Sequence, residues 1–171
     1  MADSDILGID PGSRVTGWGL VRDRSGVLEL VACGAIRTQS DADKDFSQRL
    51  ALIYRELRKI IAQYEPGEAA VEQVFSANNP RTALKLGQAR GAAIAACAGG
   101  DLEIFDYEPT LIKKAIVGVG RAEKDQVAFM VKRLLNMKDD KKYAPDTTDA
   151  LAVAVCHATT RRLNRLIGKI A

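Results

Sequence analysis

The first quarter of the chain alternates apolar stretches with short groups of turn-forming residues. Residues 4–10, 15–22 and 27–37 each have the composition and spacing of a β-strand. The sequence PGS at 11–13 separates the first two stretches, and DRSG at 23–26 separates the second from the third. Because turns this short join antiparallel neighbours, the pattern predicts a three-stranded antiparallel meander.

Helical spacing follows the meander. From Phe46 onward, apolar side chains recur every three or four residues until Pro66 and Gly67, at Leu50, Ile53, Tyr54, Leu57, Ile60, Ile61 and Tyr64. This stripe predicts a helix packed on a sheet, and the next apolar stretch, 68–75, predicts a strand.

A second helix is predicted from Asn79-Pro80 to Gly99-Gly100. Asparagine is a favourable capping residue, proline suits the first helical position, and glycine commonly follows a helix end. One face of this helix carries mostly small side chains and is suited to very close packing, at Leu84, Gly87, Gly91, Ile94, Ala95 and Ala98.

The rest of the chain predicts a strand at 102–107 and helices near 109–117, 122–137 and 146–163. A meander followed by strand–helix units indicates an α/β fold. We expect a five-stranded mixed sheet, three strands antiparallel and two parallel, with helices on both faces. The first and fourth strands would lie side by side. No linker divides the chain, so residues 1–171 are predicted to form a single domain.

Composition sets further bounds. A chain of 171 residues that is 47% hydrophobic can build the core of one soluble domain. No apolar run approaches the roughly 20 residues needed to span a bilayer, and the N-terminus lacks the basic start of a signal peptide. The three cysteines are far apart and in apolar contexts, which disfavours disulfides and zinc. We therefore expect a protein of the reducing cytoplasm.

Four carboxylates stand out from the general surface charge. Asp10 ends an apolar run just before a turn, and Glu72 lies inside the apolar stretch 69–75, where an unpaired charge would be costly. Asp146 and Asp149 are three residues apart at a helix start, so they share one face of its first turn. Oxygen ligands without histidine or cysteine suit Mg²⁺ or Mn²⁺. If the four converge, the chain is a metal-dependent nuclease.

Each carboxylate also has a structural interpretation. Asp10 alone could cap a turn, and Asp146 and Asp149 could complement the dipole of their helix. Glu72 is harder to explain in this way, because charged residues are depleted within buried strands. The lone histidine, His157, lies about 12 Å along the helix from Asp149 and is expected to pack or hydrogen-bond near the helix end. Trp18 is expected to pack on the sheet.

The charge balance changes once the candidate ligands are set aside. The chain carries 25 basic and 22 acidic residues, a net charge of +3; without the four candidates, 18 acidic residues remain and the net charge is +7. The basic residues are grouped, notably at 113–114, 121–124, 132–133, 138–142 and 161–169. A generic solvated surface could look the same. An acidic site with basic surroundings is, however, what cleavage of a polyanion requires.

Taken together, five segments closely resemble the RuvC family of Holliday-junction resolvases. In chain order they are GIDPGSRVTG at 8–17, VEQVF at 71–75, ALKLGQARG at 83–91, VGVGRAEK at 117–124 and DTTDALA at 146–152. The resemblance spans about residues 5–160. It implies a ribonuclease-H-like fold, a homodimer, and Mg²⁺- or Mn²⁺-dependent nicking of two opposed strands of a four-way DNA junction.

The resemblance also assigns expected roles to residues. The family's four metal-binding carboxylates fall on Asp10, Glu72, Asp146 and Asp149. Its important lysines correspond to Lys113 and Lys124, expected to hold phosphates, and its junction-facing aromatic corresponds to Phe75. Arg14 and Arg81 are further expected DNA contacts, and the RuvA and RuvB branch-migration proteins are expected partners. Two features depart from the family: the extension at 2–5 and the basic connection at 138–143.

The implied chemistry is hydrolysis of a phosphodiester by two divalent ions per site, with Asp10 as the candidate bridging ligand. The expected products are a 5′-phosphate and a 3′-hydroxyl. Two rivals remain. The turn after Asp10 is also similar to the phosphate loop of actin-like ATPases and sugar kinases, although the chain is short for their second lobe. A ribonuclease-H-type enzyme acting on another nucleic acid, or a junction-binding module that does not cut, would share most of these features.

Overall fold

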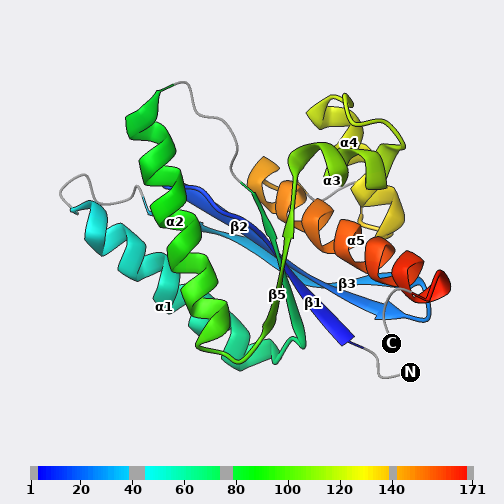
Figure 1. Cartoon of the computed structure of the whole chain (residues 1–171), viewed down its shortest axis with the longest axis horizontal. Helices are drawn as coiled ribbons and strands as arrows, with labels where there is room; N and C mark the ends of the chain where they lie inside the picture. The colour runs from blue at the N-terminus through cyan, green and yellow to red at the C-terminus, as the bar shows by residue number, and fades with distance from the viewer. Residues whose placement is uncertain (1–3, 39–44, 74–78, 139–141, 169–171) are drawn as a thin grey trace.

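In the computed structural model, which describes residues 4–38, 45–73, 79–138 and 142–168, five strands form one sheet in the order β3-β2-β1-β4-β5 (Figure 1). Their bounds are β1 Ser4–Asp10, β2 Val15–Arg24, β3 Val27–Arg37, β4 Glu68–Glu72 and β5 Glu103–Tyr107. The pairs β1–β2 and β2–β3 are antiparallel, whereas β4 runs parallel to β1 and β5 parallel to β4. This confirms the predicted five-stranded mixed sheet, in which the first and fourth strands lie side by side.

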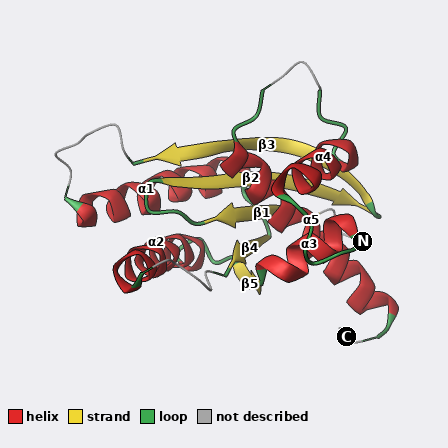
Figure 2. Cartoon of the chain, turned by 90° about the horizontal axis from the view of Figure 1, so that it is seen from above, coloured by secondary structure: helices red, strands yellow, loops and turns green. Residues whose placement is uncertain are grey.

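Helices cover both faces of the sheet, as predicted. Their bounds are α1 Phe46–Tyr64, α2 Pro80–Ala98, α3 Pro109–Val117, α4 Lys124–Leu134 and α5 Pro145–Leu166. Figures 1 and 2 show α1 and α2 on one face and α3, α4 and α5 on the other. Within the part of the chain described here, none of these helices combines the length and hydropathy that crossing a bilayer requires.

Several element boundaries differ from the sequence prediction by one to three residues, among them those of β4, α4 and α5, which ends at Leu166 where 163 was expected. Strand β4 ends at Glu72, whereas a strand to residue 75 was expected; residues 74–78 lie outside the described part. Helix α4 is shorter than 122–137. It starts after Glu123, whose backbone N–H donates to Gln126 Oε1 at 3.0 Å, and it ends before Asn136, which has a left-handed φ of 48°. Local capping therefore fixes both ends.

The core has one hydrophobic cluster on each face of the sheet. Successive residues of β1 point to opposite faces, so Leu7 and Ile9 pack with α1 and α2 whereas Ile6 packs with α5. Helix α5 is buried along most of its first four turns. The sheet is thus enclosed, and its α5 face carries both apolar and polar side chains.

Glycines let α5 lie directly on β1 and β2. A Cβ atom at Gly8 would overlap the carbonyl oxygen of Ala150, and one at Gly17 would overlap that of Asp146. Gly17 pairs with Asp10 in the β1–β2 ladder. The absence of side chains at these positions therefore brings the first turn of α5 against the end of β1.

Candidate active site

Asp10 and Glu72 lie together at one end of the sheet. Each is the last residue of its strand, and the parallel pairing of Ile9 with Val71 places the two carboxylates side by side. Strand alternation directs both toward α5. The two carboxyl groups are joined by a hydrogen bond. The predicted proximity of Asp10 and Glu72 is therefore confirmed.

The turn after Asp10 is held by its own hydrogen bonds. The Thr16 hydroxyl, fully buried, donates to the Gly12 carbonyl oxygen at 3.0 Å and accepts from the Gly12 N–H at 3.3 Å. A Cβ atom at Gly12 would overlap the Val15 carbonyl oxygen. The PGS segment thus returns the chain sharply from β1 to β2 and fixes the backbone beside the carboxylate.

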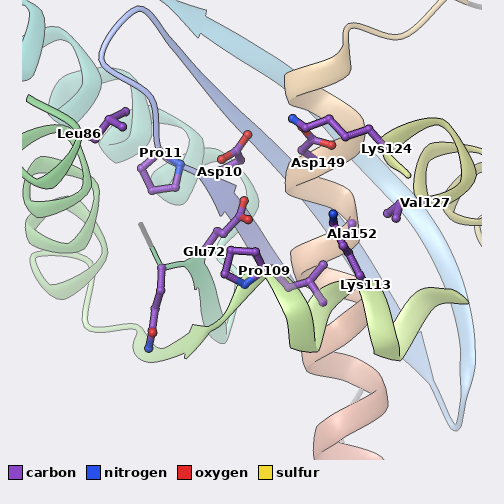
Figure 3. A pocket seen from close by; sticks show the side chains of 12 residues that line it. Asp10, Pro11, Glu72, Leu86, Pro109, Lys113, Lys124, Val127, Asp149 and Ala152 are labelled. Atoms are coloured by element: carbon purple, nitrogen blue, oxygen red, sulfur yellow. The ribbon is translucent and has the colours of Figure 1, made fainter. Parts of the chain in front are cut away.

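A cavity of about 400 Å³ opens at these carboxylates. Figure 3 shows Asp10 and Glu72 pointing from the sheet toward Asp149 on α5, with Lys124 reaching over from α4. Its lining comes from the sheet and from four helices: Asp10, Pro11, Glu72, Gln73, Leu86, Pro109, Ile112, Lys113, Lys124, Val127, Asp149 and Ala152. Three of the four predicted carboxylates and both predicted lysines therefore share one cavity.

Asp146 is the exception among the four carboxylates, because it does not line the cavity. It is half-buried one turn before Asp149 on α5, and its charge is close enough to raise the pKa of Asp10. Its position in the first turn of α5 also complements the helix dipole. Asp146 thus lies near the site but does not line its cavity.

The negative charges of these carboxylates are only partly balanced by positive charges nearby. Burial raises the pKa of Asp10 to about 6, helped by the charges of Asp149 and Asp146 and opposed by the hydrogen bond with Glu72 and by Lys124. Burial, followed by the charge of Asp10, raises the pKa of Glu72 to about 8. The hydrogen bond to Asp149 raises the pKa of Lys124. The site therefore has an excess of negative charge that favours a cation.

The donor set fits a hard divalent cation, since all the candidate ligands are carboxylate oxygens. In the described ranges, however, no three histidine, cysteine, aspartate or glutamate side chains are grouped closely enough to hold an ion as they stand. Asp10 is bonded to Glu72, and Asp149 Oδ2 lies 3.1 Å from Lys124 Nζ. Bringing the three acids onto one ion therefore requires their side chains to move closer together, and Lys124 would compete with that ion for Asp149.

The other expected DNA contacts are placed around this cavity. Arg14 is exposed in the turn after β1, and Arg81 is exposed in the first turn of α2; neither lines the cavity. Phe75 lies outside the described residues, as do 139–141 of the basic connection. The sequence did not indicate the apolar wall made by Pro109, Ile112 and Val127, because these residues meet only through the packing of α3 against α4.

His157 belongs to a separate buried network at the other end of the same sheet face. Its Nδ1 lies 2.7 Å from the Tyr107 hydroxyl and its Nε2 lies 3.0 Å from Glu68 Oε2. Arg161 donates to Glu68 and, at 3.0 Å, to Asp23. The predicted packing and hydrogen-bonding role of His157 is confirmed. The aromatic Trp18, also predicted to pack, is half-buried against the α1 side of the sheet.

The strand order, with acids at the ends of its two central parallel strands and on the last helix, defines a protein of ribonuclease-H-like architecture. A family model described as "Crossover junction endodeoxyribonuclease RuvC" matches residues 6–157. The chain belongs to the RuvC family of crossover junction endodeoxyribonucleases.

Relatives of that family match nearly the whole chain. The crossover junction endodeoxyribonuclease RuvC of Oleidesulfovibrio alaskensis is 62% identical, over 94% of this chain and 94% of its own. That of Lawsonia intracellularis is 57% identical, over 97% of this chain and 96% of its own. Among solved structures, T. thermophilus RuvC in complex with Holliday junction substrate has a TM-score of 0.86 at 28% identity, covering 94% of this chain and 96% of that one.

Proposed function

We propose that this protein resolves four-way DNA junctions by nicking two opposed strands, leaving 5′-phosphate and 3′-hydroxyl ends, in recombination and DNA repair. The observation that carries the proposal is the convergence of Asp10, Glu72 and Asp149 in one cavity of a RuvC family member. A solved relative with a TM-score of 0.86 is bound to a Holliday junction. We further propose that residues 1–171 act as one nuclease domain, because one sheet supports both hydrophobic clusters.

We infer that the site uses Mg²⁺ or Mn²⁺, two ions per site, held by Asp10, Glu72, Asp146 and Asp149. When bound, such ions make a water nucleophilic at neutral pH and stabilise the leaving oxygen. Asp10, on the central strand β1, would be the ligand shared between them. The excess of negative charge described above supports the assignment.

The remaining residues of the site would bind and orient DNA. Lys113 and Lys124 line the cavity and would hold phosphates beside the scissile bond. Pro109, Ile112 and Val127 form a wall that keeps bulk water from that side. Arg14 and Arg81, both exposed, would neutralise phosphates farther out, and Phe75 would meet unstacked bases.

We propose that two copies act together, because one domain with one carboxylate cluster makes one nick and resolution needs two related by a two-fold axis. The exposed face of α2 is the candidate interface. A Cβ atom added at Gly87 or Gly91 would meet no other described residue within 4 Å, and Leu84 is 64% exposed. Close helix approach over these positions would bury Leu84. The branch-migration proteins RuvA and RuvB are the proposed further partners.

A cleavage and binding assay tests the nuclease proposal. Wild type with Mg²⁺ should nick a synthetic four-way junction but not linear duplex or RNA–DNA hybrid. Asp149→Asn should lose cleavage and keep junction affinity in a gel shift, because it removes a ligand and one repulsive charge while the basic contacts remain. Cleavage of the hybrid in preference to the junction would assign the enzyme to another nucleic acid.

A mixed dimer tests the symmetry. A heterodimer of wild type with Asp10→Asn, isolated through two different tags, should bind a junction normally and nick one strand. Gly91→Arg should produce monomers without disturbing the fold of each copy, because the position is open to solvent. Paired nicks by the heterodimer, or full resolution by the monomeric variant, would defeat the dimer proposal.

A further inference from the structure

Lys124 occupies an unusual position for an exposed lysine. It is the first residue of α4, and its side chain is 80% exposed, yet its Nζ lies 3.1 Å from Asp149 Oδ2. An exposed pair of this kind is normally weak, because two long side chains must be held in place for little gain. Here the ammonium also acts on Asp10 and Glu72, since its charge lowers the pKa of both. Lys124 therefore interacts electrostatically with three carboxylates at once.

The acids of the cavity are divided into two pairs. Asp10 is hydrogen-bonded to Glu72 on the sheet, and Asp149 is bonded to Lys124 on the helix side. Figure 3 shows this division, with the Lys124 side chain lying against Asp149 and the sheet carboxylates opposite. An ion shared by the two pairs needs an oxygen of Asp149, and Lys124 already contacts one of them, Oδ2.

We propose that Lys124 is a positioning residue that holds Asp149 in the metal-free enzyme and competes with the divalent ion for it. The inference rests on the proposed metal-dependent function. An ion that binds Asp149 through Oδ2 takes the place of Lys124 and repels its ammonium, which is then left in the cavity that DNA enters. A DNA phosphate can then take the place of Asp149 as its partner. Ion binding frees Lys124 for a DNA phosphate, and a DNA phosphate that pairs with Lys124 frees Asp149 for the ion. The binding of the ion and the binding of DNA should consequently strengthen each other.

Mn²⁺ titration without DNA tests the competition, using the electron paramagnetic resonance signal of the free ion. Lys124→Met should bind Mn²⁺ about fivefold more tightly than wild type, within the usual range for coupled sites. Lys113→Met is the matched control, because it removes an equal charge from the same cavity without removing the contact to Asp149, which Lys124 makes. It should change the affinity less than twofold. Lys124→Gln should match Lys124→Met.

Thermal unfolding gives a second measurement, in which the substitution that tightens Mn²⁺ binding should lower the stability of the protein without metal. In chelator, Lys124→Met should unfold about 2 °C below wild type, because Asp149 loses its counter-ion. With saturating Mn²⁺ the difference should vanish or reverse. The high exposure of the side chain means that the substitution leaves the packing intact.

The outcomes separate the two proposals. Unchanged Mn²⁺ affinity in Lys124→Met, or equal tightening in Lys113→Met, overturns the competition while leaving the metal site in place. Tightening in Lys124→Met alone, together with weaker binding by Asp10→Asn, supports both. Wild type that binds no Mn²⁺ in this cavity overturns the metal-dependent function and the competition together.

Discussion

Glu68 and Glu72 are two glutamates on the same strand, β4, and point to the same face of the sheet, yet their surroundings differ. Glu68, at the start of β4, accepts hydrogen bonds from His157 and Arg161. Glu72, at the end of β4, is bonded to another acid, Asp10. Both are largely shielded from solvent. A carboxylate surrounded by fixed donors supports the fold, whereas one beside further acids is available to bind a cation.

The difference between the two ends follows from the neighbouring elements. At the Glu68 end, α5 contributes a histidine and an arginine, and β2 contributes Asp23 to complete the pairing of Arg161. At the Glu72 end, the same helix contributes Asp146 in its first turn and Asp149 just after it. Helix α5 thus supplies the partners that pair the charges at the Glu68 end, whereas at the Glu72 end it adds further negative charge.

The largest expected effect is the loss of cleavage when Glu72, rather than Glu68, is replaced. Glu72→Gln should lower junction cleavage in Mg²⁺ by more than about 100-fold, since changes behind a metal ligand already cost 10–100-fold. Its melting temperature in chelator should equal or exceed that of wild type as the pH rises towards 8, because the amide cannot ionise beside Asp10. Cleavage rate and thermal unfolding on one preparation decide it. Near wild-type cleavage would remove Glu72 from the site.

Gly17→Ala should disturb the acidic end of α5. The added methyl group overlaps the Asp146 carbonyl oxygen, so the first turn of the helix must shift. Overpacking of this kind costs about 1–3 kcal/mol, and a displacement near 1 Å at a reacting centre can cost about 100-fold in rate. We expect a tenfold to 100-fold loss of cleavage with junction binding retained. An unaffected rate would show that the helix position is not critical.

Glu68→Gln should have the reverse profile of Glu72→Gln. It weakens charge-assisted bonds from Arg161 and His157, each worth about 1.5–3 kcal/mol, so the melting temperature should fall by about 4–8 °C. Cleavage at 25 °C should stay within threefold of wild type, because Glu68 is remote from the cavity. Loss of cleavage without loss of stability would contradict the division between the two ends.

The two ends should also respond oppositely to pH in chelator. Burial lowers the pKa of His157 below its ordinary 6.5, against the attraction of Glu68 and Glu103, with Arg161 and the Tyr107 hydroxyl also facing the ring. The unfolded chain therefore takes up the proton more readily, and this network loses stability as the pH falls below about 6.5. Glu72 changes the stability in the opposite direction with pH. Its raised pKa means that the acidic end loses stability as the pH rises from about 4.5 to about 8.

The predicted effect is a difference between each variant and wild type in how stability depends on pH. Relative to wild type, His157→Gln should unfold with a weaker loss of stability below pH 6.5, and Glu72→Gln with a weaker loss between pH 4.5 and 8. Denaturant titrations across this range measure both differences. Parallel curves for wild type and His157→Gln would show that the histidine is not held neutral by the fold.

Much of this arrangement was predictable from local signals. The strand and helix positions follow from apolar spacing and from Gly and Pro, and Glu72 stood out because a charge interrupts an apolar strand. The partners of Glu68 were not predictable, because His157 and Arg161 meet it only through the packing of α5 on β4, elements far apart in the sequence. The contact between Lys124 and Asp149 depends in the same way on the packing of α4 beside α5.

The placement of Asp149 on α5 has a consequence for how activity arises during synthesis. Asp10 leaves the ribosome early and Asp149 late, and α5 packs on β1 and β2 through contacts distant in sequence. A nascent chain that has completed the meander therefore exposes the sheet face that α5 will cover, with Asp10 at its end. Docking of α5 would bury that face and assemble the acidic cluster in a single event, so a partly made chain would carry no competent nuclease.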